Sequence, residues 1–202
     1  MKRIIAFLLC VLLLGAMLAG CRTTPKKALV GQWKAEADLA MAYETMLAKA
    51  DPAMTGHIDI QNFTIEVFLT FNEDGSYAWT VNDTHMRLGS KNMRDAIAAG
   101  LSTYLQIETG MPVDQMLAAS GKTMDELMDE YFGPDMEQVV RKNLCSQGTY
   151  SVKNGKLTLA NEEGFVIFDG HIETSGDKLE LKDGVTTDLI TNLMPLTFRK
   201  QK

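Results

Sequence analysis

Three histidines and one cluster of carboxylates are the side chains of this chain best suited to metal binding or acid–base chemistry. His57, His85 and His171 lie far apart, and none stands at a ligand spacing from a cysteine or from another histidine. Asp83 lies two residues before His85, so a metal site there would require His57 or His171 to converge on the pair. Exposed loop or strand positions explain the histidines more simply. We therefore predict no metal site and no cofactor.

The carboxylate cluster lies between residues 125 and 130 and consists of Asp125, Glu126, Asp129 and Glu130. Such side chains could bind calcium or supply a general acid. The apolar residues among them indicate instead a short amphipathic helix whose carboxylates face water. The Thr-x-x-Glu pattern at Thr123 and Glu126 is typical of a capping box and predicts where this helix begins. The sequence favours the hydrated helix face.

Cysteine chemistry has one candidate in the folded part of the chain. Cys10 and Cys21 lie in the N-terminal segment, which leaves Cys145 without a second thiol. The surrounding pattern offers no partner that would stabilise a thiolate, so we expect Cys145 to be a small buried hydrophobe. Gly-x-Ser-x-Gly, His-Glu-x-x-His and phosphate-loop motifs do not occur in the sequence. We therefore predict that the protein is not an enzyme.

The N-terminal segment carries the most specific pattern. Two basic residues precede an apolar run over residues 4–18, which is too short to span a bilayer comfortably and is typical of a secretory signal peptide. The run ends in Leu18-Ala19-Gly20-Cys21, which resembles the lipobox of bacterial lipoproteins. The resemblance implies that Cys21 carries a diacylglycerol and becomes the N-terminus after cleavage. A plain signal peptide with a chance cysteine is the alternative.

These features divide the chain into a signal peptide at 1–20, a polar tether at 21–28 and one domain at 29–202. The lipobox resemblance places the protein on the extracytoplasmic face of the cell membrane or the outer membrane, held there by Cys21. The chain has 26 acidic and 20 basic residues, and the signal peptide holds two of the basic ones. Because the other basic residues are scattered along the sequence, we expect no nucleic-acid partner and repulsion from anionic headgroups.

Alternating apolar residues predict strands on both sides of a long helical block. The clearest alternation covers residues 64–71, and after a turn at 72–75 it continues over 77–81. Asn154-Gly155 predicts a type I′ hairpin, and Gly170 predicts a bulge. Strands are also expected near 30–36, 148–152, 157–159, 165–174, 179–181 and 196–199, with a loop over 183–193.

Helical spacing of apolar residues predicts a helix over about 35–50 and a helical insertion over about 86–145. The predicted fold is therefore mainly β with a helical insertion (α+β). It is an eight-stranded antiparallel up-and-down barrel with helices after the first strand and between the third and fourth strands. A β-sandwich is the alternative.

Several short motifs along the strands resemble those of bacterial lipocalin-like lipoproteins. They are Gly31-x-Trp33, Phe71-Asn72-x-Asp74-Gly75-x-Tyr77, Gly148-Thr149-Tyr150, Leu157-Thr158-Leu159 and Lys178-Leu179-Glu180-Leu181. The resemblance covers residues 29–82 and 147–200 and leaves out the helical block. It implies a lipocalin-like barrel whose closed end contains Gly31 and Trp33, with Arg199 stacked on the indole ring.

Two functions fit this fold best, and an enzyme such as a hydrolase comes third because no nucleophile and base can be paired from the sequence. The first is a membrane-anchored, non-enzymatic protein that binds a small apolar ligand or lipid in the barrel mouth, beneath Met-rich helices. Its predicted lining residues are Phe68, Tyr77, Trp79, Met93 and Ile97. The second is a structural or protein-interaction module of the cell envelope, with a filled barrel and a partner bound by the helical block. The sequence favours the first and leaves the ligand and any protein partner unidentified.

Overall fold

The computed structural model describes residues 26–50, 52–132, 135–186 and 188–202. The predicted signal peptide, Cys21 and residues 22–25 of the tether lie outside these ranges. Among the helices of the described ranges, none combines the length and the apolar character needed to cross a bilayer.

Eight antiparallel strands close into one barrel, in which each strand pairs with its sequence neighbours and the last strand pairs with the first. The strands are β1 (Gly31–Asp38), β2 (Thr64–Phe71), β3 (Ser76–Val81), β4 (Ser146–Lys153), β5 (Lys156–Asn161), β6 (Val166–Ser175), β7 (Lys178–Thr186) and β8 (Leu196–Lys200). The predicted up-and-down barrel with added helices is confirmed. Closure leaves no sheet edge unpaired.

The alternation read from residues 64–71 sets which side chains fill the barrel. Ile65, Val67, Leu69 and Phe71 are buried inside, and the residues between them face outwards. The predicted hairpin turn between β4 and β5 is also confirmed. Asn154 and Gly155 have φ angles of 53° and 74°, which match the type I′ conformation that Asn-Gly favours.

Strand β1 continues further than its residue types suggest. We expected a helix from residue 35, but β1 runs to Asp38 and α3 (Leu39–Ala50) follows it. Ala35 and Ala37 are buried and pair with Val67 and Ile65 on β2. The helix propensity of alanine is worth only a few tenths of a kcal/mol per residue, roughly, so pairing and burial decide the conformation here.

The strand β6 bends beside Gly170, where the sequence predicts a bulge. The pairing between β6 and β7 shifts register between His171 and Ile172. A Cβ atom on Gly170 would lie 1.8 Å from the carbonyl oxygen of Asp183, so the two backbones can approach only because this residue is glycine.

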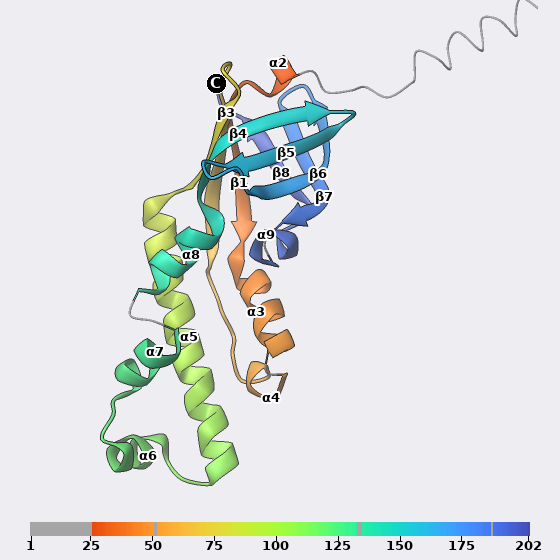
Figure 1. The fold of residues 1–202 in the computed structure, drawn as a ribbon. Helices are drawn as coiled ribbons and strands as arrows, with labels where there is room; N and C mark the ends of the chain where they lie inside the picture. Colours follow the sequence, from red (N-terminus) through yellow and green to blue (C-terminus); the bar gives the residue numbers. More distant parts are fainter. Residues whose placement is uncertain (1–25, 51, 133–134, 187) are drawn as a thin grey trace, which may run out of the picture.

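Most helices lie beyond one end of the barrel (Figure 1). The inserted helices are α5 (Asp83–Thr109), α6 (Val113–Ser120), α7 (Met124–Phe132) and α8 (Met136–Leu144), and α4 (Pro52–Thr55) follows α3. Helices α3 to α7 project away from the strands, and we call them the helical extension. Helix α8 returns the chain to β4.

The barrel end next to the helical extension is covered by a helix that the sequence does not indicate. Residues 183–193, expected as a loop, contain the end of β7 and a short helix, α9 (Asp188–Asn192). Helix α9 packs against α3 and β7. Ile190 and Leu193 are both buried, so this segment is part of the core.

The opposite end of the barrel is closed by α2 (Lys26–Leu29), and we call this end the α2 end. Leu29 is fully buried, and its carbonyl oxygen accepts a hydrogen bond from Nε1 of Trp33 at 2.6 Å. Residues 26–28, which the sequence assigns to the tether, are exposed but form part of α2, and Lys26 lies over the Tyr150 ring.

Candidate binding site in the helical extension

The barrel interior is occupied by the aromatic side chains that we expected to line a ligand cavity. Tyr77 and Trp79 point inwards but are 2% and 0% exposed. The Trp79 ring meets the Phe198 ring edge to face, with 6.1 Å between the centroids. Tyr77 Oη shares a hydrogen bond with Ser146 Oγ at 2.8 Å. These side chains fill the space in which the predicted ligand would lie.

Phe68 lies on the outer face of β2, so its predicted place in a ligand cavity is wrong. Its neighbours Val67 and Leu69 are the buried residues. Successive side chains of a strand point to opposite faces, and two adjacent residues cannot both line the interior. Phe68 is half-buried against the outside of the barrel.

Met93 and Ile97 also lie elsewhere than predicted. Both are on α5, buried at 0% and 2% exposure, on the helix face that also carries Gly89 and Gly100. A Cβ atom at Gly89 would overlap the Phe63 ring, so α5 packs tightly against the segment that leads into β2. Met93 and Ile97 therefore belong to the solid core at the base of the helical extension.

The predicted packing of Arg199 on Trp33 is replaced by a contact from the next residue. Lys200 Nζ lies 5.1 Å from the centroid of the Trp33 ring. Arg199 points outwards from β8, and its guanidinium lies 3.2 Å from the Asp177 carboxylate. Gly31 lies beside this contact, since a Cβ atom there would be 3.0 Å from Lys200 Cε. The cation–π prediction is right in kind and wrong by one residue.

An apolar groove opens at the far part of the helical extension, between α4, α5, α6 and α7. Its volume is about 530 Å³. The lining residues are Met54, Leu101, Tyr104, Leu105, Val113, Met116, Leu117, Ser120, Lys122 and Leu127. A cavity of this size, lined mainly by aliphatic, aromatic and methionine side chains, is typical of small-molecule sites.

Helix α6 forms one wall of this groove and is poorly covered. None of its eight residues is buried, although Val113, Met116 and Leu117 share one apolar face. Gly110 and Gly121 adopt left-handed conformations, with φ angles of 65° and 67°, and end α5 and α6. The turn at Gly110 leads the chain from α5 into α6, and the turn at Gly121 leads it on towards α7. The apolar face of α6 lines the open groove.

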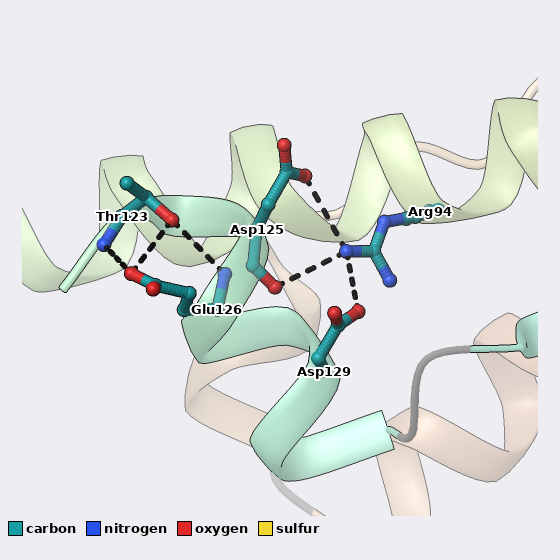
Figure 2. A network of polar contacts seen from close by, with 5 residues as sticks. All are labelled: Arg94, Thr123, Asp125, Glu126 and Asp129. Carbon is teal, nitrogen blue, oxygen red and sulfur yellow. Dashed lines mark hydrogen bonds and ion pairs between the residues drawn. The ribbon is translucent and has the colours of Figure 1, made fainter.

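Helix α7 begins at the predicted capping box, which is confirmed (Figure 2). The backbone N–H of Thr123 donates to Glu126 Oε2 at 2.7 Å, and the N–H of Glu126 donates to Thr123 Oγ1 at 3.2 Å. The backbone and hydroxyl hydrogen bonds from Thr123 lower the pKa of the Glu126 carboxyl. Glu126 is therefore a structural cap in its ionised form.

Two other carboxylates of the 125–130 cluster hold α7 against α5 (Figure 2). Arg94 Nη2 on α5 lies 2.8 Å from Asp129 Oδ1 and 3.3 Å from Asp125 Oδ1, and it donates to the Asp125 carbonyl oxygen at 3.2 Å. Glu130 forms an ion pair with Lys122 at the groove edge. All four carboxylates are exposed, so the predicted hydrated helix face is confirmed, and its ion pairs to Arg94 and Lys122 also fix the wall of the groove.

The residues considered for acid–base or metal chemistry are not brought together. His57 lies beside Tyr104, with 6.2 Å between ring centroids, whereas His85 is exposed near the start of α5. His171 Nδ1 lies 2.9 Å from Asp183 Oδ1 on the barrel surface. The described residues contain no group of three or more His, Cys, Asp or Glu side chains that could hold a metal ion. Cys145 is partly buried, and this burial raises the pKa of its thiol.

Comparison of the chain with protein-family models, curated proteins and solved structures finds no match. The groove must therefore be interpreted from its own residues.

The sequence indicated some of the residues that line the groove but not how they come together. The helical spacing of Leu101 and Leu105 and the apolar face of α6 were visible in the sequence, whereas the folding of α6 and α7 back onto α5 was not.

Proposed function

We propose that this chain is a lipid-anchored, non-enzymatic protein of the cell envelope that binds a small apolar ligand or a lipid acyl chain in the groove of the helical extension. The observation that carries the proposal is the contrast between a barrel filled by its own side chains and an open apolar groove of about 530 Å³. In this proposal the lipocalin-like barrel is a scaffold, and the ligand site lies in the helical extension.

The anchor part of the proposal rests on the lipobox pattern that ends at Cys21. Replacement of Cys21 by serine should release the protein from the membrane fraction, because serine cannot form the thioether. Cys10→Ser, which changes a cysteine upstream of the pattern, is the matched control and should leave the protein membrane-bound. Membrane attachment of the Cys21→Ser variant would refute the anchor.

The ligand part can be tested with a neutral apolar dye, N-phenylnaphthylamine, whose fluorescence rises in apolar sites. Leu117→Asp places a charge in the groove and should weaken dye binding about tenfold or more, because the carboxylate would have to be desolvated. Ala119→Asp introduces the same charge on an exposed position of the same helix and should change affinity by less than about twofold. Equal affinities of the two variants would contradict a groove site.

A protein partner is the second candidate, and two exposed side chains favour it. Ile107 and Met111 are 60% and 49% exposed, and they lie at the end of α5 and in the turn before α6. Together with the groove they would form a wider apolar surface, as protein interfaces require. Photo-crosslinkers at residues 107 and 111 would then trap one protein in cells, and a crosslinker at residue 119 would not.

A further inference from the structure

Four lysines that are scattered in the sequence meet at the α2 end of the barrel. They are Lys26, Lys27, Lys200 and Lys202, and we call them the basic rim. Lys200 Nζ lies 3.5 Å from the carbonyl oxygen of Ala28, and the backbone N–H of Gln201 donates to Gln32 at 2.8 Å. These contacts place the end of β8 beside α2 and the start of β1 (Figure 1).

The lysines of the basic rim are not held in ion pairs. Within the described ranges, none of the four lysines forms an ion pair with a carboxylate. Two of them lie over aromatic rings instead: Lys26 Nζ is 4.7 Å from the Tyr150 centroid and Lys200 Nζ is 5.1 Å from the Trp33 centroid. A cation over a ring face keeps its full charge and part of its hydration. The nearby Asp74 carboxylate accepts hydrogen bonds from the Ser76 amide and hydroxyl, which lower its pKa, and the charge of Lys26 lowers that pKa further.

The inserted helices have the opposite character. Residues 83–144 contain ten acidic and six basic side chains. Four of the six basic ones are ion-paired: Lys91, Arg94, Lys122 and Arg141. The molecule is therefore electrically polarised, with lysines outside ion pairs at the α2 end and excess carboxylates on the helices beyond the other end of the barrel. An anionic surface would attract the first end and repel the second.

The α2 end is also the end nearest to the proposed anchor. Lys26 follows Cys21 by five residues, a length of chain that spans at most about 17 Å. A hollow at this end, of about 690 Å³, is lined by Lys26, Lys27, Val30, Glu73 and Tyr150. A lipid on Cys21 would thus hold two ammonium groups that lie outside ion pairs, and a tyrosine ring, close to the headgroups, where such side chains are favoured.

From this geometry we infer that the basic rim is a docking surface for the headgroups of anionic phospholipids. Docking fixes the α2 end against the bilayer, so that the barrel stands as a spacer and the helical extension with its groove points away from the membrane. The inference rests on the lipid anchor of the proposed function, because the anchor brings the rim to the surface. It assigns the net-negative chain a local affinity for anionic lipid that its overall charge conceals.

The test uses the lipid-modified full chain in vesicles of phosphatidylcholine, with or without phosphatidylglycerol, and measures amide hydrogen exchange. Exchange over residues 26–31 and 72–76 should slow about threefold or more when phosphatidylglycerol is present, and molar salt should remove the effect. The double variant Lys27→Glu/Lys202→Glu should lose this protection. Arg87→Glu/Lys142→Glu makes the same charge change at exposed positions on α5 and α8 and should keep it.

Equal exchange on the two kinds of vesicle, or lipid-dependent protection on α5 to α7 instead, would overturn the docking surface. Failure of the anchor has a different signature: the chain would not float with vesicles of pure phosphatidylcholine, where the basic rim has no anionic partner. If the charge-reversed variants fold poorly, the salt dependence of the lipid-modified chain without substitutions still decides between these outcomes.

Discussion

In the barrel, the Trp79 and Phe198 rings meet edge to face, and both side chains are completely buried. In α6 of the helical extension, no residue is buried and the apolar side chains line an open groove. One chain thus contains a tightly packed core and an apolar surface left uncovered. Exposed apolar surface is costly in water, which is why we propose this groove, and not the barrel, as the binding site. The comparison shows that a barrel fold alone does not locate a ligand site.

The largest expected difference is in the free energy of unfolding when a side chain is truncated to alanine in each of the two regions. Trp79→Ala should lower the free energy of unfolding by about 3 to 5 kcal/mol, because it leaves a cavity in the packed barrel. Leu117→Ala in α6 should lower it by less than about 1 kcal/mol, since the leucine is only partly buried. Urea unfolding measures both. Similar costs would mean that the extension is packed like the barrel.

Tyr43 of α3 lies at the base of the helical extension, in a part that is packed more tightly than α6. The Tyr43 ring stacks on Phe63, and its hydroxyl is buried with no hydrogen-bond partner among the described residues. Burial raises the pKa of Tyr43 from 10.0 to about 12. The folded state therefore holds the proton more tightly than the unfolded state, and stability present below pH 10 is lost as the pH rises towards 12.

Tyr43→Phe removes both the titration and the unpaired hydroxyl. Its free energy of unfolding at neutral pH should equal or exceed that of the unmodified chain. Between about pH 10 and pH 12 it should retain on the order of 2 kcal/mol that the unmodified chain loses. Chemical unfolding across this range provides the measurement. If both proteins lost the same free energy of unfolding between pH 10 and pH 12, Tyr43 would be accessible to water.

Helix α7 should be able to unfold locally while the barrel stays folded. Arg94→Met removes the contacts to Asp125 and Asp129, so the local stability of α7 should fall by about 1 to 2 kcal/mol. Amide exchange should accelerate over α7 and stay unchanged in the strands. Lys91→Met, the control, breaks an exposed ion pair with Asp95 within α5 and should cost less than about 0.5 kcal/mol. Accelerated exchange throughout the barrel would mean that the two regions unfold together.

The smallest effect concerns the α2 end. Lys200→Met should cost about 0.5 to 1 kcal/mol through loss of the contact with Trp33. Arg199→Met removes only an exposed pair with Asp177 and should have a smaller effect. Thermal unfolding of the two variants would distinguish them. A larger loss for Arg199→Met than for Lys200→Met would support the packing of Arg199 on Trp33 that the sequence suggests.

Local patterns predicted the parts of the fold that depend on neighbouring residues. The alternation over residues 64–71, the Asn154-Gly155 turn and the Thr123–Glu126 capping box each specify their own structure. Ala35 and Ala37 could not be assigned in this way, because their conformation depends on pairing with β2. The inward or outward direction of Phe68 and Arg199 changes with a shift of one residue, so a small error in phase places a side chain on the wrong face.

The candidate site was harder to predict because distant contacts build it. Arg94 and Asp129 are 35 residues apart in the sequence, and their ion pair holds the groove wall in place. The apolar faces of α5 and α6 were each visible as helical periodicity. Their convergence on one groove with Met54 depends on two glycine turns and this ion pair, which no local pattern specifies.

Our central claim is that the barrel is filled and that the binding groove lies outside it. The most direct test is a titration with N-phenylnaphthylamine, followed by nuclear magnetic resonance of labelled methionine methyl groups. Met54 and Met116 line the groove, whereas Met86 and Met194 lie in the core near the barrel end next to the helical extension. We predict that the dye shifts the signals of Met54 and Met116 and leaves those of Met86 and Met194 in place. Shifts at Met86 and Met194, with none at Met54 and Met116, would place the ligand in the barrel and contradict the account.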